Sequence, residues 1–277
     1  IKISRTNAGK IIDTTYTWDN ADNIVRIQSG TFLDLNYTRD QTYRIIKADL
    51  TAAPLKPGDF FKSETLNHTV DAACRINTSG FIFDQRGRLT AFPGNTMTWN
   101  DASWLTQLNN VTLSYNDTGD LTSRVDDGKT TRYFYNYGIK LHPIVAEKDD
   151  ASGNFKYYVW APNGELIYMI DAGNGNKVYY YHFDVTGSTS ALTDTAGAVT
   201  DAYAYGPYGK VLSHDGTSDQ PFTFIGKWGV RQEGTDGSIF HMRARYYDAD
   251  TARFLSKEPL WPNLKDPLQL NPYQYAV

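Results

Sequence analysis

Residues that could carry out chemistry are concentrated near the end of the 277-residue chain. Arginines and acids gather in two segments, Met-Arg-Ala-Arg-Tyr-Tyr-Asp at 242–248 and Phe-Leu-Ser-Lys-Glu-Pro at 254–259. Two carboxyl groups that share a proton can hydrolyse a bond, one acting as base and the other as acid. If the chain has a catalytic activity, we expect it in this part of the sequence.

Other motifs that bind or react are missing from the sequence. Cys74 is the only cysteine, so no intrachain disulfide forms, and we expect a small buried residue rather than a nucleophile. The five histidines lack the spacing of a metal site, and no glycine-rich phosphate loop occurs. The segment 171–176 is closer to a hairpin turn than to a calcium loop, because it lacks the final Glu. We therefore expect neither a metal nor a cofactor.

The composition of the chain limits the kinds of partner that it can bind. The net charge is −4 with acids and bases mixed along the chain, which gives no electrostatic case for nucleic acid. No apolar run is long enough for a membrane span. Because residue 1 is Ile rather than an initiator Met, we expect a fragment or a processed product.

Aromatic residues followed by turns recur along the chain. Phe83-Asp84, Tyr115-Asn116 and Phe183-Asp184 are each followed by a glycine three residues after the Asp or Asn. An Asp or Asn side chain closes such a turn, and Gly adopts the positive φ. The sequence therefore predicts stacked β-hairpins of about 20 residues each, in which every copy covers its neighbour. The aromatic anchors are Trp18, Tyr37, Phe83, Trp99, Tyr115, Tyr135, Trp160, Phe183 and Tyr205.

These residues resemble the RHS/YD-repeat family, and from Tyr179 to Val277 the chain is similar to the RHS repeat-associated core. The resemblance implies an all-β fold, a long spiralling antiparallel sheet that forms part of a hollow shell and ends in a plug. Residues 1–178 would be repeat wall, with an insertion or degenerate repeat at 47–80, and 179–277 the core. Within the core we expect wall to about Leu212 and plug from Phe222.

The resemblance also implies a function. Bacterial members are secreted or cell-surface proteins, exported by specialised systems, whose shell encloses a toxin or effector segment at the C-terminal end of the same polypeptide. The remaining shell repeats, or a partner shell chain, would complete the enclosure. Some members cut off the enclosed segment themselves, as aspartate-type autoproteases. Animal teneurins use a similar shell in adhesion, and a carbohydrate-binding module is the remaining alternative.

The family's cutting site maps onto two residues of this chain. Its arginine corresponds to Arg245 and its first acid to Glu258, where the family usually has Asp. The second Asp would lie about four residues beyond Val277, and Asp266 does not match its spacing. Since one carboxyl cannot act as both acid and base, the alternative is a structural ion pair between Arg245 and Glu258.

Six tryptophans raise the possibility of sugar stacking. Trp18, Trp99 and Trp160 occupy anchor positions, so we expect them to pack in the wall. Trp104, Trp228 and Trp261 lie outside the repeat and are the better candidates for a carbohydrate contact.

Overall fold

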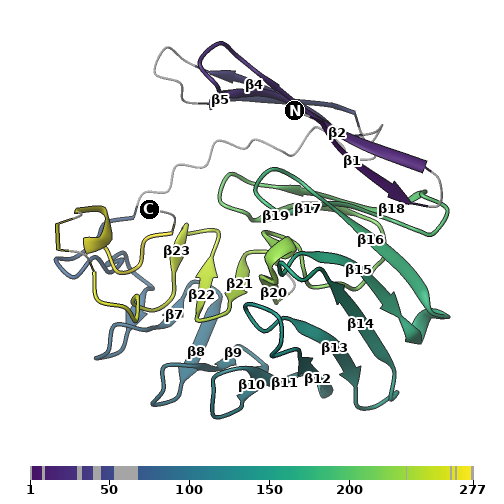
Figure 1. The fold of residues 1–277 in the computed structure, drawn as a ribbon. Coiled ribbons are helices and arrows are strands. Elements are labelled where there is room, and N and C mark those ends of the chain that lie inside the picture. The colour runs from purple at the N-terminus through teal and green to yellow at the C-terminus, as the bar shows by residue number, and fades with distance from the viewer. Residues whose placement is uncertain are drawn as a thin grey trace.

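The computed structural model describes residues 2–7, 10–29, 33–39, 45–52, 68–234, 236–262, 264–265 and 267–275. These residues form three antiparallel sheets and little helix (Figure 1). The predicted all-β fold of antiparallel hairpins is confirmed. In each sheet, strands that follow one another in sequence are neighbours in space, so the chain advances hairpin by hairpin.

The first sheet has five strands and the second has fourteen. The first contains β1 (Lys2–Asn7), β2 (Lys10–Trp18), β3 (Ile24–Ser29), β4 (Leu33–Arg39) and β5 (Ile45–Ala52). The second, which we call the wall, contains β6 (Ile82–Phe83), β7 (Leu89–Phe92), β8 (Asn95–Trp99), β9 (Leu105–Leu108), β10 (Val111–Tyr115), β11 (Leu121–Asp126), β12 (Lys129–Tyr135), β13 (Ile144–Asp149), β14 (Phe155–Trp160), β15 (Leu166–Asp171), β16 (Lys177–Phe183), β17 (Thr189–Thr193), β18 (Val199–Tyr205) and β19 (Val211–Asp215).

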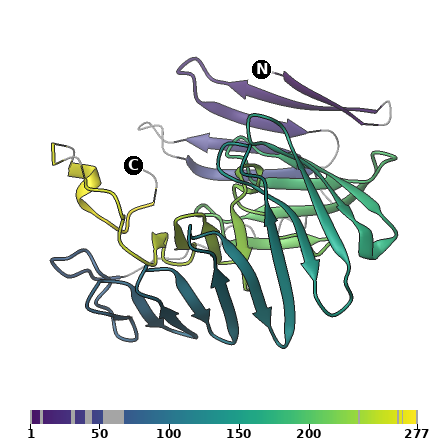
Figure 2. The ribbon, with the colours of Figure 1, turned by 60° about the horizontal axis from the view of Figure 1, so that its bottom comes forward.

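The third sheet belongs to residues 222–275, which we call the inner unit. Its strands are β20 (Arg231–Glu233), β21 (Ile239–Met242), β22 (Arg245–Asp248) and β23 (Arg253–Phe254). The 3-10 turns are η2 (Ala172–Asn174), η3 (Gly226–Trp228) and η4 (Pro267–Leu270). Figures 1 and 2 show the wall curving around β20–β23, with the five-stranded sheet next to the β17–β19 end. The segment after β23 that carries η4 projects away from the wall.

The larger of two hydrophobic clusters is shared by the wall and the inner unit, and the smaller is centred on the inner unit. Phe222, Ile239, Tyr246 and Leu255 of the inner unit belong to the same buried cluster as the inward-facing residues of the wall. Backbone hydrogen bonds join the two, for example from the Leu89 amide to the Leu255 carbonyl at 2.8 Å. Burial of apolar area in this cluster is the main force that holds the inner unit in place.

The predicted anchors mark where every second strand of the wall ends. The register shifts at Trp99, Tyr115 and Trp160, and each of them pairs with an apolar residue six positions later in the sequence. These pairs are Trp99 with Leu105, Tyr115 with Leu121 and Trp160 with Leu166. The anchor and its partner therefore close these three turns of the wall in the same way.

The polar ends of the anchors link each hairpin to the one before it. Trp99 Nε1 donates to the Leu89 carbonyl at 2.7 Å, and Tyr115 donates through its hydroxyl to the Leu105 carbonyl at 2.8 Å. Each accepting carbonyl lies on the residue that pairs with the preceding anchor. The pattern favours Tyr and Trp over Phe, which has no donor. The same kind of hydrogen bond joins the side chains of three more anchors to carbonyl groups: Tyr135 to Leu121, Trp160 to Ile144 and Tyr205 to Thr189.

The predicted turns also form. Asp84 Oδ1 accepts hydrogen bonds from the Arg86 and Arg88 amides, both at 2.9 Å, and Gly87 has a φ of +79°. The segment 171–176 is the connection between β15 and β16, so the hairpin prediction is confirmed.

Two burial predictions are wrong. Cys74 is partly exposed and has a φ of +59°, because it takes the glycine position of a turn in which Asp71 Oδ1 accepts from the Arg75 amide. Trp18 is 41% exposed, whereas Trp160 is 7% exposed. Trp160 packs edge-on against Phe222 of the inner unit, and this neighbour explains its burial. Of the segment 47–80, residues 53–67 lie outside the described part.

The turn at Asp184 gives a testable prediction. Its Oδ1 accepts from the amides of Thr186 and Ser188, both at 2.9 Å, and from the Thr186 hydroxyl at 2.7 Å. Asp184→Ala leaves these donors unpaired, so we expect a loss of about 1–3 kcal/mol in the free energy of unfolding. Asp184→Asn retains the accepting oxygen, as Asn116 does in its own turn, and should stay within about 0.5 kcal/mol of the wild type. Urea denaturation measures both; equal losses would contradict the role of Oδ1.

Candidate functional site

The structure brings Arg245 and Glu258 together. Arg245 begins β22, directly after the two-residue turn that joins it to β21. Its Nη2 lies 2.6 Å from Glu258 Oε2. The Glu258 amide donates to the Pro272 carbonyl at 2.8 Å, and Arg245 Nη1 donates to the same carbonyl at 3.3 Å. The pair therefore ties the segments around residues 258 and 272 to the sheet of the inner unit.

Arg245 packs against an aromatic ring as well as against the carboxylate of Glu258. Its guanidinium carbon lies 3.5 Å from the centre of the Phe254 ring, and its side chain is 13% exposed. Burial lowers the pKa of Arg245, and the charge of Glu258 opposes that shift. Glu258 is the only carboxylate within ion-pair distance of Arg245 in the described part of the chain. Asp266 lies outside the described residues.

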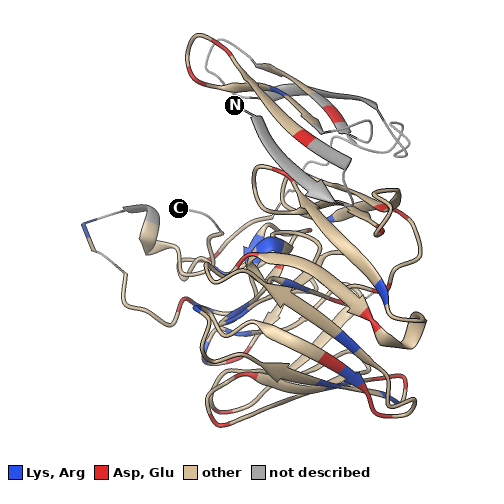
Figure 3. Cartoon of the chain, turned by 45° about the vertical axis from the view of Figure 1, so that its right-hand side comes forward, with Lys and Arg blue, Asp and Glu red and all other residues tan. Residues whose placement is uncertain are grey.

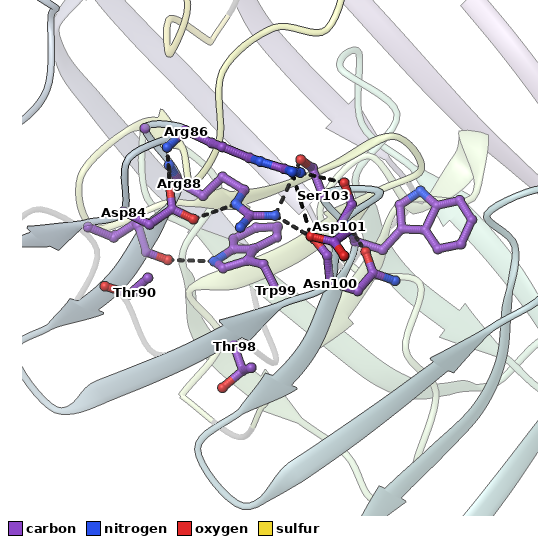
Figure 4. A network of polar contacts seen from close by, with 12 residues as sticks. Asp84, Arg86, Arg88, Thr90, Thr98, Trp99, Asn100, Asp101 and Ser103 are labelled. Carbon is purple, nitrogen blue, oxygen red and sulfur yellow. Dashed lines mark hydrogen bonds and ion pairs between the residues drawn. The ribbon is translucent and has the colours of Figure 1, made fainter.

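The arginine and the acid form part of the lining of a cavity of about 780 Å³. One side is built by turns of the wall, including those that carry Arg88 and Trp104, and the other by the β21–β22 turn. Figure 4 shows the wall side: Arg88 Nε donates to Asp84 at 2.6 Å, and its Nη1 donates to the Asn100 carbonyl at 2.5 Å. These bonds fix the guanidinium at the cavity edge.

A buried arginine near this cavity is not apparent from the sequence. Arg231 is 2% exposed, its Nη2 pairs with Glu233, and its guanidinium carbon lies 4.4 Å from the Tyr133 ring centre. Glu233 also accepts from Arg124 of the wall at 3.1 Å. Nε and Nη1 of Arg231 are buried without a partner. The alternating pattern of β20 offers no signal that distinguishes this arginine from an exposed one.

Asp201, His214 and Ser218 meet at β18–β19. His214 Nε2 lies 2.8 Å from Asp201 Oδ1, and the Ser218 hydroxyl donates to the same oxygen at 2.7 Å. In a hydrolytic triad the serine would instead contact the histidine. The cluster therefore anchors the 216–219 segment, and its bonds hold the pKa of Asp201 below its ordinary value against the opposing effect of burial.

A buried glutamate lies on β13. Glu147 is 8% exposed, and its Oε1 has no hydrogen-bond partner. Burial raises the pKa of Glu147, because the charged form loses its hydration, although Lys156 and Arg231 favour the charge. The unfolded chain therefore releases this proton at a lower pH than the folded chain.

Glu147→Gln should stabilise the protein at alkaline pH. Because the folded pKa is raised, the stability of the wild type falls as pH rises above the unfolded pKa, and Gln removes that loss. We expect a gain on the order of 1 kcal/mol at pH 8 that shrinks toward pH 4. Asp101→Asn at an exposed turn is the matched control. Thermal unfolding across this pH range measures the effect; a gain that does not depend on pH would contradict it.

The three tryptophans proposed for sugar contact differ in exposure. Trp104 packs 5.6 Å from the Tyr115 ring, and Trp228 packs so closely on Gly187 that a Cβ there would lie 3.1 Å from its Nε1. Trp261 is 95% exposed. Only Trp261 of the three presents most of its ring to solvent.

The described residues form neither a cluster of metal ligands nor a membrane-spanning helix. No group of three or more His, Cys, Asp or Glu side chains is placed to hold a metal ion in the described ranges. No helix formed by the described residues is long and apolar enough to cross a membrane. Figure 3 shows acids and bases interspersed over the wall.

The chain is similar in sequence to several long bacterial proteins. It is 26% identical over 239 residues to the tRNA3(Ser)-specific nuclease WapA of Bacillus spizizenii, and 25% identical over 239 residues to the tRNA nuclease WapA of Bacillus subtilis. Each match covers 82% of this chain and 10% of the relative. A shorter match, 30% identical over 92 residues, joins it to the double-stranded DNA deaminase toxin A of Burkholderia cenocepacia, covering 31% of this chain and 6% of the toxin.

Solved structures share the fold. The complex TcdB2-TccC3 matches with a TM-score of 0.61 and 16% identity, over 99% of this chain and 17% of that one. The complex TcdB2-TccC3-Cdc42 matches with a TM-score of 0.58 and 13% identity, over 95% and 18%. These matches confirm the predicted shell-type sheet. The family model of the teneurin YD-shell matches residues 2–277. Together with the repeated anchors and turns, this match shows that the chain belongs to the teneurin YD-shell family.

Proposed function

We propose that the chain is part of the wall and plug of a hollow shell that encloses a toxin or effector segment, at the C-terminal end of the same polypeptide. One observation carries the proposal: the wall curves around the inner unit, and residues of both belong to one buried hydrophobic cluster. The chain spans about a tenth of the WapA proteins and under a fifth of the TcdB2-TccC3 chain. The relatives' names include nucleases and a deaminase toxin, which supports a secreted or cell-surface bacterial protein with a toxic cargo.

In this proposal residues 1–178, which include the five-stranded sheet and the wall up to β15, are shell repeats, and residues 179–277 are the core that closes the shell. Hydrogen bonds from the Thr189 amide to the Thr223 carbonyl at 2.9 Å and from the Lys227 amide to the Gly187 carbonyl at 3.0 Å support a closing role for residues from Phe222 onward. They hold the inner unit on the concave side of β16–β17, where it would cover one end of the enclosed space.

Limited proteolysis of the full-length gene product tests enclosure. An enclosed segment should resist a protease that digests the same segment when it is made alone. Removing residues 222–277 should make the segment sensitive, because the inner unit would no longer cover it. If the segment is cut equally fast with and without the shell, the enclosure is disproved.

The edges of the wall point to a partner. The 14-stranded sheet ends at β6 and at β19, and an end strand has unpaired backbone groups that favour pairing with another strand. Leu260 and Trp261 add exposed apolar surface, at 75% and 95% exposure. We therefore propose that remaining shell repeats, or a partner shell chain, continue the sheet. Light scattering after size-exclusion chromatography should detect self-association of the isolated chain; a monomer at high concentration would argue against this.

Self-cleavage is the second candidate function, and the 2.6 Å contact of Arg245 with Glu258 at the cavity favours it. The full-length protein should then release a C-terminal fragment, and Arg245→Ala should abolish the release. Arg253→Ala, a nearby arginine that binds the Asn271 side chain at 3.2 Å, is the control. If the wild type and Arg245→Ala give the same single band on a denaturing gel, the site is not a protease.

A teneurin-like adhesion or carbohydrate-binding module is the third candidate, and the exposed ring of Trp261 is the observation that favours it. Aromatic rings exposed in this way can stack on sugars. A glycan array should show binding that Trp261→Ala abolishes. An array without hits would remove this candidate.

A further inference from the structure

We propose that the cavity between the wall turns and the inner unit binds a polypeptide segment rich in Asp and Glu. The cavity, of about 780 Å³, is within the size range of pockets that take ligands much larger than a single ion. Its lining comes from the β6–β7, β8–β9, β10–β11 and β12–β13 connections on one side and the β21–β22 turn on the other. Such binding would be a property of the isolated chain, distinct from the formation of a shell.

The lining of the cavity is strongly cationic in a chain whose net charge is −4. Among the described residues, only Asp120 and Glu258 contribute carboxylates to the lining. An excess of one sign in a partly enclosed space attracts a ligand of the opposite sign. The cationic side chains are Arg86, Arg88, Arg231, Arg243, Arg245 and Lys257.

The two lining carboxylates are already engaged. Glu258 pairs with Arg245 at 2.6 Å. Asp120 accepts hydrogen bonds from Asn116 Nδ2 at 3.1 Å and from the Tyr137 hydroxyl at 2.9 Å. These bonds direct the Asp120 oxygens to neutral donors of the β10–β11 turn and the β12–β13 connection. Acids just outside the lining pair with two of the arginines: Arg88 with Asp84 at 2.6 Å and Arg86 with Asp101 at 3.6 Å. Among the described residues, Arg243 and Lys257 are the lining cations that have no carboxylate within ion-pair distance.

Arg243 is the clearest uncompensated charge. It projects from the β21–β22 turn, where its Nη2 donates to the Trp228 carbonyl at 2.6 Å and its Nη1 donates to the Leu141 carbonyl. Carbonyl groups hold the guanidinium in place but carry no charge to balance it. Among the described residues, no carboxylate lies within ion-pair distance of Arg243. Partial burial of such a charge is unfavourable, and an anion in the cavity would offset that cost.

Arg231 supplies unused donors deeper in the same lining. It is 2% exposed, and Glu233 occupies only its Nη2. Its Nε and Nη1 have no partner, although buried donors are nearly always paired. Glu233 also pairs with Arg124 at 3.1 Å, and Arg124 pairs with Asp126 at 2.8 Å, so it is the unused donors of Arg231 rather than an unbalanced charge that favour a ligand here. An oxyanion that reached this end of the cavity would give one of these donors an acceptor.

The distribution of the cations identifies the class of ligand. They project from separate elements: the β6–β7 turn, β20, the β21–β22 turn and the segment after β23. A single small anion can contact only a few of them, whereas a peptide with several acidic side chains can contact most. Guanidinium groups bind carboxylates through paired hydrogen bonds. Trp104 and Tyr115 add flat apolar surface for the side-chain stems.

Fluorescence anisotropy tests the proposal on the 277-residue chain. The probes are a short fluorescein-labelled peptide in which Asp and Glu alternate with Gly and Ser, and its counterpart with Asn and Gln. The acidic peptide should bind, the neutral one should not, and added salt should weaken binding. Arg243→Gln should raise the Kd about tenfold, as expected for the loss of a charge-assisted contact.

Arg86→Gln and Lys257→Gln, at the exposed edge of the cavity, should each weaken binding, and the double variant more strongly. Arg132→Gln, whose side chain is 56% exposed and lies away from the cavity, is the matched control and should leave the Kd unchanged. Circular dichroism reports whether each variant folds. If Arg243→Gln does not fold, the Arg86→Gln/Lys257→Gln double variant tests the proposal in its place. The proposal is overturned if both peptides bind equally, if neither binds, if the cavity variants bind as the wild type does, or if inorganic pyrophosphate displaces the peptide more effectively than an unlabelled acidic peptide does.

Discussion

Phe222→Ala should lower the free energy of unfolding by about 3–5 kcal/mol. Phe222 is fully buried, and its ring meets those of Tyr158 and Trp160 edge-on, at 4.8 and 5.5 Å. Both partners belong to β14, so the phenylalanine joins the inner unit to the middle of the wall. Truncation removes these contacts and leaves a cavity that the surrounding sheet cannot fill. Urea denaturation followed by tryptophan fluorescence and circular dichroism measures the loss.

Phe134→Ala is the control for this experiment. Phe134 lies on β12 and is 44% exposed, so its truncation should cost less than about 1 kcal/mol. If Phe222→Ala were no more destabilising than Phe134→Ala, the inner unit would not be docked on the wall as described. A separate early transition in the Phe222→Ala variant would show that the inner unit undocks before the wall unfolds.

Gly209→Ala should cost about 3–5 kcal/mol, because two effects add. Gly209 has a φ of +94°, which strains any residue with a Cβ, and the new Cβ would overlap the ring of Phe224. Phe224 cannot move away freely, because it is 7% exposed and packs against Phe240 at 5.4 Å. The β18–β19 turn therefore fits against the inner unit only if position 209 lacks a side chain.

Gly128→Ala separates the backbone strain from the steric overlap with a neighbouring side chain. Gly128 has a φ of +77° in the β11–β12 turn, and nothing lies within 4 Å of the position that a Cβ would take there. The substitution should therefore show the backbone strain alone, about 1–2 kcal/mol. Thermal and urea denaturation of the two variants compare the costs. Equal losses would mean that the contact between Gly209 and Phe224 is absent in solution.

The repeat was predictable because one physical rule recurs along the chain. An aromatic anchor, an Asp or Asn and a glycine occur together often enough to predict hairpins, and Phe83-Asp84 with Gly87 forms the expected turn. Cys74 shows the limit of the rule. It occupies the glycine position of a turn at a φ of +59°, and its sequence context gives no glycine to mark the turn.

The candidate site was predictable only in part. The family resemblance predicted that Arg245 and Glu258 lie in one site, and the structure places them in contact. It did not predict that Arg231 and Arg243 line the same cavity. Their positions depend on how the inner unit docks on wall turns more than 100 residues away in sequence, as the bond from Arg243 to Leu141 illustrates. Such contacts have no local periodicity, so a single sequence does not reveal them.

A cryo-electron microscopy map of the full-length gene product tests the central claim most directly. We expect the 14-stranded sheet to continue at its edges into a closed shell, with β20–β23 inside its curve and additional density in the enclosed space. A wall that stays open, or a C-terminal polypeptide folded outside it, would contradict the proposal that this chain encloses a cargo.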